Sequence, residues 1–345
     1  MKAEDRTGQP PGYELISTYR AELMGFAILM IMFCHLDTAQ SHNGVATSFL
    51  ASLLHTFTVG VDVFMFLSGL GLYYSYTKRR PSYTDFVKAR LSRILPLYFL
   101  IAGPTYLVLD LLIKNKALWT FIKDLSFLSF FIGKSTCYWF ILWITVFYLL
   151  FPLLYHFLDK GSHGLTKLLL FSLAWWLIIG LGSKYSEWIE MLKMPLDRLP
   201  IFMAGIFCGR LAMKKHALKR WIILIFLFTG YFLFFLQKRT ALNSLSFVLY
   251  YPIRAFLCIS IISTIIFAME VLQRISDPVF KGLSGCLKWL GGLTLECYLF
   301  HQSYLLLFGF PYVFSKYMLT AFVLPVMSAA LVFCFRAVLR KKGIT

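Results

Sequence analysis

Long apolar runs alternate with short polar segments along almost the whole chain. A helix that crosses a bilayer needs about 20 mostly apolar residues. Ten runs approach that length, and each predicts one membrane-spanning helix. They lie at 20–37, 50–76, 93–113, 137–157, 165–182, 199–213, 220–237, 248–272, 289–309 and 318–337. The segment 117–132 is rich in aromatic residues, but Lys123 and Asp124 interrupt it, so we expect it to lie at the membrane interface.

Positive charges fall mainly in alternate connecting segments. With a cytoplasmic N-terminus, 23 of the 34 Lys and Arg residues lie in inside segments and ten lie outside, while Arg254 falls within a span. Cytoplasmic loops carry the excess of Lys and Arg in membrane proteins. The pattern predicts an all-α, polytopic membrane protein with about ten helices in one bundle and both termini in the cytoplasm. We expect a single membrane domain over 1–345, with short tails at 1–19 and 338–345.

The composition agrees with a membrane protein. The 345 residues are 59% hydrophobic and only 14% charged, whereas soluble domains carry about 25% charged residues. The net charge of +18 is explained by topology, so no nucleic-acid partner is expected. Seven scattered cysteines without metal-ligand spacing predict neither a disulfide framework nor a metal site. The first apolar run lacks a small-residue cleavage site, and we expect it to be a retained helix.

Among the titratable residues inside apolar runs, we single out His35, Asp62 and Glu296. Ionisable groups are expensive in hydrocarbon, so each is a candidate for function. Imidazole is the side chain best suited to proton transfer near neutral pH. Arg20 lies about 22 Å before His35 along the same predicted helix, within a shared sector of about 60° that includes Met24. The plain alternative for His35 is a histidine hydrogen-bonded to a neighbouring helix.

Other candidate residues have simple structural alternatives. Arg90 and Arg93 are three apart and share a helix face, which suits a phosphate-bearing ligand but also an ordinary positive flank. Ser68 with Gly69 forms a small pair that lets helix backbones approach closely. Trp139 is a candidate for lining a substrate path or for an interfacial aromatic belt.

Six short motifs occur in the order typical of the membrane-bound acyltransferase family 3, the O-acyltransferases of bacterial polysaccharides, and the chain resembles that family over nearly its whole length. The motifs are His35 at the end of the first span, Gly60 to Gly69, Arg90-x-x-Arg93, Trp139 to Pro152, Arg198 to Gly205, and Tyr298-Leu-Phe-His301. One position departs from the pattern. Many members carry an Arg eleven residues before the histidine, where this chain has Met24, and Arg20 lies one turn earlier.

The resemblance implies transfer of an acyl group, usually acetyl, from cytoplasmic acetyl-CoA or another acyl-CoA to an extracytoplasmic glycan or lipid-linked sugar. It implies a multi-pass protein of a bacterial inner membrane, surrounded by membrane lipid and needing no metal. His35 is expected to be the general base, with Asp62 or Glu296 orienting its ring. The donor is expected to contact Arg90, Arg93, Arg20, Ser68 and Trp139.

Two other functions fit the same residues. The chain is alternatively a proton-coupled secondary transporter or flippase, in which the three intramembrane titratable residues form a relay. It is also compatible with a non-catalytic scaffold in a polysaccharide-export assembly. The sequence shows no inverted repeat of the kind that many transporters carry.

Overall fold

The computed structural model describes residues 13–41, 54, 56–132, 138–216, 220–239, 246–309, 316 and 318–341. Within these residues all regular secondary structure is helical, and there is no strand. This confirms the all-α prediction.

Six helices in the described part of the chain are long and apolar enough to cross a membrane. They are Phe57–Arg79, Tyr83–Ile113, Trp139–Asp159, Gly164–Gly182, Val248–Ile275 and Met318–Phe335. Helices also occupy the other four predicted spans, as α2 (Arg20–Ser41), α11 (Leu199–Met213), α12 (Arg220–Arg239) and α15 (Thr294–Phe308). Helices of 15 residues, such as α11 and α15, extend about 22 Å, less than a hydrocarbon core of about 30 Å. The multi-pass character is therefore supported, whereas the number ten and the cytoplasmic termini stay predictions.

One predicted boundary was wrong, and another is untested. The span expected from residue 50 contains α4 (Gly60–Arg79), which follows a short 3-10 turn at Phe57–Val59; residues 50–53 and 55 lie outside the described residues, so the predicted start stays a prediction. The span expected at 289–309 is divided between α14 (Asp277–Gly292) and α15. Two consecutive glycines end α14, and glycine is a poor helix former.

The helices form two compact units. Unit 1 comprises Met1–Leu23, Val61–Arg80 and Phe151–Leu287, and unit 2 comprises Met24–Gly60, Pro81–Leu150 and Lys288–Thr345. Helices α2, α8 (Trp139–Asp159) and α14 contribute residues to both. The single membrane domain expected from the sequence stays a prediction.

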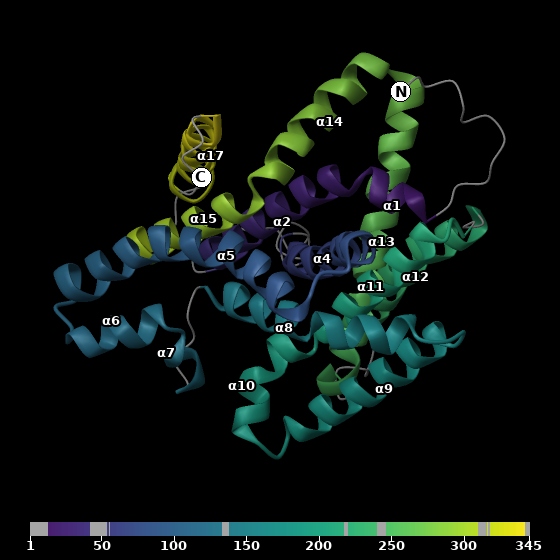
Figure 1. Ribbon diagram of the computed structural model, residues 1–345, viewed down its shortest axis with the longest axis horizontal. Helices are drawn as coiled ribbons and strands as arrows, with labels where there is room; N and C mark the ends of the chain where they lie inside the picture. The colour runs from purple at the N-terminus through teal and green to yellow at the C-terminus, as the bar shows by residue number, and fades with distance from the viewer. Residues whose placement is uncertain are drawn as a thin grey trace. The chain divides into compact units, whose positions relative to one another are not determined.

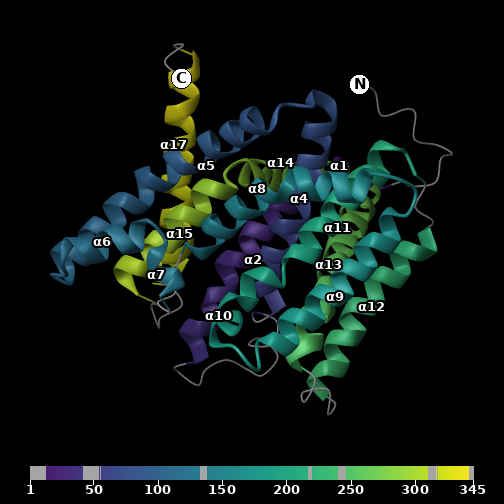
Figure 2. The same cartoon turned by 60° about the horizontal axis from the view of Figure 1, so that its bottom comes forward.

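Unit 1 is built mainly from α4, α11, α12 and three further helices. These are α9 (Gly164–Gly182), α10 (Glu187–Leu196) and α13 (Ser246–Ile275). Helices α12 and α13 run side by side, and α9 packs against α10, α11 and α13 (Figure 2). Helices α4 and α11 approach so closely that a Cβ atom at Gly69 or Gly205 would collide with the other helix's backbone. The close approach predicted for the Ser68-Gly69 pair is thus confirmed at Gly69.

Unit 2 centres on α15, which packs against α5 and against the C-terminal helical segment (Figure 1). Its elements include α5 (Tyr83–Tyr106), the π-helix η2 (Leu107–Ile113), α6 (Leu118–Leu125), α7 (Leu128–Phe131), the π-helix η4 (Met318–Val323) and α17 (Leu324–Lys341). The Ser82 hydroxyl caps α5 by accepting a hydrogen bond from the Asp85 amide at 3.2 Å. Because α5 starts before residue 93, Arg90 and Arg93 both lie within it. The interfacial position of 117–132, now seen as two short helices, stays a prediction.

Candidate active site

Two histidines meet in unit 2. His35 lies in α2 and His301 lies in α15, and the structure places His301 Nε2 3.2 Å from His35 Nδ1. The ring centroids are 5.0 Å apart and the ring planes are inclined by 55°. His301 is fully buried, and His35 is half-buried. The pair joins residues 266 positions apart in the sequence.

Backbone carbonyls fix the tautomer that we assign to each ring. The Ala321 carbonyl oxygen lies 2.5 Å from His301 Nδ1, and the Ile31 carbonyl oxygen lies 2.8 Å from His35 Nδ1. A carbonyl oxygen can only accept a hydrogen bond, so Nδ1 carries the proton in both rings. The basic lone pair of each neutral ring is therefore on Nε2. His301 Nε2 faces the Nδ1–H of His35, and the lone pair of His35 is on the opposite side of its ring.

His301 was not among the candidate residues chosen from the sequence, although it ends the late Tyr298–His301 motif. The available signal was a second histidine inside an apolar run. Glu296, which was chosen, lies in the first turn of α15 and is buried. Five residues correspond to a rotation of about 140° around a helix, so Glu296 and His301 lie on different faces of α15. The role expected for Glu296 in orienting His35 stays a prediction.

Asp62 belongs to a buried charge cluster in unit 1, which we call the Asp62 cluster and define as Asp62, Arg198 and Arg254. Arg254 Nη2 donates to Asp62 Oδ2 at 2.6 Å, and Arg198 Nε lies 3.4 Å from Asp62 Oδ1. All three side chains are only 4–6% exposed. Arg254 also donates to the Tyr250 hydroxyl at 3.1 Å, and the Arg198 guanidinium lies 5.7 Å from the centre of the Tyr251 ring.

A buried carboxylate is tolerated when charged hydrogen-bond partners surround it. The Asp62 cluster meets that condition and ties α4 to α13 and to the N-terminus of α11. Its geometry gives Asp62 a structural function within unit 1. The role expected for Asp62 in orienting His35 stays a prediction.

Asp197 lies next to the Asp62 cluster, just after α10. Burial raises the pKa of Asp197 to about 7, against the opposing effect of the nearby Lys193 and Arg198 charges. Its Oδ2 atom is buried and makes no hydrogen bond, while Trp176 Nε1 donates to its backbone carbonyl at 3.0 Å. Asp197 therefore titrates close to neutral pH, unlike an exposed aspartate.

Arg20 contacts α4 within unit 1. Its Nε donates to the Leu67 carbonyl at 3.1 Å. A Cβ atom at Gly71 would lie only 2.6–2.9 Å from three atoms of the Arg20 guanidinium, so the glycine makes room for this side chain. The structure thus brings Arg20 to the segment of α4 that holds the buried Ser68. The donor contacts predicted for Arg20 and Ser68 stay predictions.

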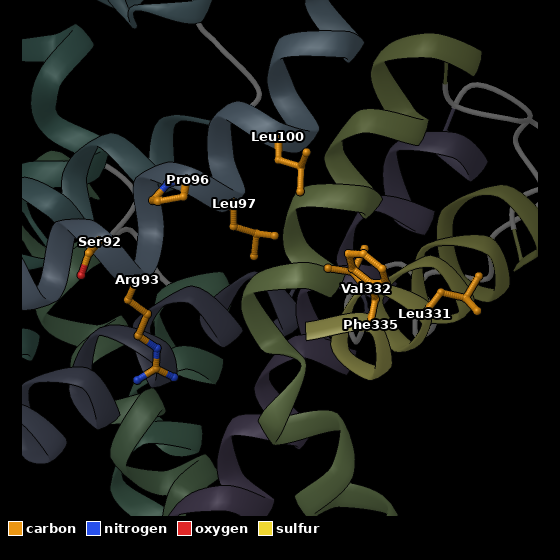
Figure 3. Close-up of a pocket in the computed structure, with 8 residues that line it drawn as sticks. All are labelled: Ser92, Arg93, Pro96, Leu97, Leu100, Leu331, Val332 and Phe335. Carbon is orange, nitrogen blue, oxygen red and sulfur yellow. The ribbon is translucent and has the colours of Figure 1, made fainter. Parts of the chain in front are cut away.

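Arg90 and Arg93 differ in their surroundings within unit 2. The Arg90 guanidinium lies 5.4 Å from the centre of the Phe86 ring, a cation–π distance, and the residue is half-buried. Arg93 is exposed and borders a groove of about 430 Å³ between α5 and α17. Figure 3 shows Leu97 and Leu100 of α5 pointing toward the α17 side chains Val332 and Phe335, with Ser92 and Arg93 at the far end of the α5 row.

The groove continues as a second hollow of about 310 Å³, which shares Leu100 and Val332 with the first. The second hollow reaches Thr105 and Ser303, whose hydroxyls are 3.0 Å apart and hydrogen-bonded. Between Arg93 and these hydroxyls the walls are almost entirely hydrocarbon. Trp139, the remaining candidate, is the first residue of α8, and its half-buried ring lies edge-on to Phe140.

The helical fold and its long apolar helices define a class, namely a multi-pass membrane protein, and this one holds a buried pair of imidazole rings. A family model described as an acyltransferase domain matches residues 23–339. The chain therefore belongs to the membrane-bound acyltransferase family 3. Comparison with curated proteins and with solved structures gave no match.

Proposed function

We propose that this membrane acyltransferase moves an acyl group, acetyl in the simplest case, from cytoplasmic acyl-CoA to a hydroxyl of an extracytoplasmic glycan or lipid-linked sugar. Family membership supports acyl transfer. The observation that carries the proposal is the His35–His301 pair, because a hydroxyl must lose its proton to become a nucleophile. A bacterial inner membrane is the location that separates a cytoplasmic donor from an extracytoplasmic acceptor.

The proposed reaction needs one base that later acts as an acid. His35 Nε2 takes the proton of the acceptor hydroxyl while the hydroxyl oxygen forms a bond to the thioester carbonyl carbon. When the tetrahedral intermediate collapses, the C–S bond breaks, and His35 returns the proton to the leaving thiolate. The products are an acyl ester and free CoA thiol, and the imidazole ends in its starting state.

The donor's phosphates are proposed to meet Arg90 and Arg93. Guanidinium groups bind phosphate through paired hydrogen bonds, and the two arginines lie one turn apart on α5. The groove beside Arg93 suits a hydrocarbon chain better than the pantetheine arm, because amides buried along its apolar walls would lack hydrogen-bond partners. We therefore place donor phosphates at these arginines without routing the arm along this groove. Arg20, Ser68 and Trp139 are further proposed donor contacts.

Mass spectrometry of surface glycans tests the proposal. Cells would carry the wild type, His35→Ala or His163→Asn, with protein amounts and size-exclusion profiles matched. His163 is exposed in the segment before α9, so its substitution is a matched histidine control. We expect an O-acyl mass increment with the wild type and with His163→Asn, and none with His35→Ala. Full O-acylation by His35→Ala would exclude His35 as the base, and no increment with the wild type would favour a transporter or a scaffold.

A further inference from the structure

We infer that His301 is a positioning residue that holds His35 in the one tautomer able to accept the hydroxyl proton at Nε2. The inference rests on the proposed function, since it assigns a partner to the proposed base. The family's expected carboxylate is not required for this task, because a neutral imidazole with a fixed proton performs it.

The hydrogen bonds form a directed chain that starts at the backbone of η4. The Ala321 carbonyl accepts from His301 Nδ1–H, which leaves His301 Nε2 as an acceptor. The single Nδ1–H of His35 is shared between His301 Nε2 at 3.2 Å and the Ile31 carbonyl oxygen at 2.8 Å, and both acceptors favour the same tautomer. A hydrogen-bond partner on the far side of a reacting imidazole commonly fixes which ring nitrogen carries the proton.

The segment that supplies the first acceptor is itself unusual. Ala321 is fully buried within a π-helix, an element that is rare and frequently found at functional sites. Phe33, half a turn before His35, packs against Phe322, the residue after Ala321, with ring centroids 5.2 Å apart. Leu54 and Leu305 complete a buried apolar cluster around Ala321. Packing thus holds α2, α15 and η4 in register, as a positioning role requires.

Burial makes this arrangement more effective. A hydrogen bond in an apolar interior is electrostatically stronger than one in water. When His35 takes the second proton, its Nδ1–H becomes a charged donor to His301 Nε2, and charged hydrogen bonds are the stronger ones. A serine-protease triad uses a carboxylate in this position. His301 supports the imidazolium without bringing a permanent charge into the apolar interior.

The test compares His301→Gln with His301→Asn in purified, detergent-solubilised protein, using acetyl-CoA and an acceptor glycan identified by the mass spectrometry above. A Gln side chain reaches far enough to offer an amide oxygen to His35 Nδ1–H. An Asn side chain keeps a donor for Ala321 but is too short to reach His35. We expect His301→Asn to lower kcat about 10- to 100-fold with KM for acetyl-CoA unchanged and with a displaced pH–rate profile. His301→Gln should restore most of the rate, and His163→Asn should behave as the wild type.

Several outcomes would overturn the inference. Wild-type kcat and an unmoved pH profile in His301→Asn would show that His35 needs no such partner. Equal losses in both His301 variants, together with a lower Tm and an unmoved profile, would show a merely structural pair. In both cases an inactive His35→Ala would leave the proposed function standing, whereas an active His35→Ala would remove the proposed base itself.

A measurement on the wild type is independent of how the variants fold. Nitrogen-15 NMR of labelled histidines distinguishes a protonated ring nitrogen from an unprotonated one. We expect His35 to carry its proton on Nδ1 at neutral pH, assigned by the loss of its signals in His35→Ala. A proton on Nε2 would overturn the inference directly.

Discussion

The Asp62 cluster of unit 1 and the His35–His301 pair of unit 2 bury titratable groups in opposite ways. In unit 1 the Asp62 carboxylate is held between two guanidinium groups, which balance its charge. In unit 2 the His35–His301 pair is held by backbone carbonyls and by one ring nitrogen, with no permanent charge on either ring. Buried ion pairs of this kind tie helices together, whereas a neutral imidazole offers one nitrogen lone pair that can accept a proton. The contrast is consistent with a structural role for the Asp62 cluster and with the proton transfer that we propose for the histidine pair.

The largest expected effect comes from Asp62→Asn. The substitution removes the carboxylate and leaves Arg198 and Arg254 buried beside a neutral amide, and breaking a buried ion pair in this way costs about 3–5 kcal/mol. We expect a strong fall in folded yield and in Tm, measured by thermal unfolding in detergent. His35→Ala should keep a Tm near that of the wild type while losing O-acylation. A wild-type Tm together with a loss of activity in Asp62→Asn would contradict the structural role of the Asp62 cluster.

The buried Asp197 of unit 1 is expected to make the stability of the folded protein depend on pH. The folded protein keeps a proton on Asp197 up to a pKa of about 7, whereas an unfolded aspartate releases it near pH 3.9. The folded state therefore binds more protons between these values, and stability falls as the pH rises from about 4 to about 7. Asp197→Asn should remove this loss and raise stability at pH 8 by at most about 4 kcal/mol.

Tm values at pH 5 and pH 8 check this expectation. The difference between the two pH values should shrink in Asp197→Asn relative to the wild type. Glu187→Gln, which removes an exposed carboxylate from α10, is the control and should leave the difference unchanged. An identical pH dependence in Asp197→Asn and the wild type would show that Asp197 does not keep its proton in the folded protein.

Arg93→Gln tests whether the basic face of α5 binds the donor. Losing one guanidinium–phosphate contact at an exposed position should raise KM for acetyl-CoA about tenfold, which corresponds to about 1.4 kcal/mol. Lys88→Gln removes an exposed positive charge from the same helix and should change KM much less. Equal effects of the two substitutions would indicate a general positive flank instead of a phosphate contact.

Local sequence geometry anticipated several of these features. The shared helix face of Arg90 and Arg93 follows from their spacing of three, and the close backbone approach at Gly69 follows from the absence of a side chain. The break between α14 and α15 was missed, because an apolar run does not show where a helix stops within it.

Contacts between residues far apart in the sequence could not be predicted from local patterns. Asp62 meets Arg254 across 192 positions, and His35 meets His301 across 266. The sequence identified buried titratable residues that needed partners, because an unpaired charge in hydrocarbon is costly. Which partner each residue finds depends on how the helices pack, and a single sequence without contacts does not encode that in any local pattern. The structure places the imidazole of His301 beside His35, a pairing that no local pattern indicated, while the expected carboxylate partner stays a prediction.

The smallest effect separates two roles for Arg20. In Gly71→Ala the new Cβ displaces the Arg20 guanidinium, which sits at the end of a flexible side chain and can move. Losing its hydrogen bond to Leu67 costs about 1 kcal/mol, which the better helix propensity of alanine offsets by a similar amount. Gly282→Ala, at a helical glycine with no atoms near its added Cβ, isolates the propensity gain and should raise Tm. If Arg20 only stabilises α4 through its hydrogen bond to Leu67, Gly71→Ala leaves KM for acetyl-CoA unchanged, and the Tm of Gly71→Ala falls below that of Gly282→Ala. A raised KM would instead make Arg20 a donor contact.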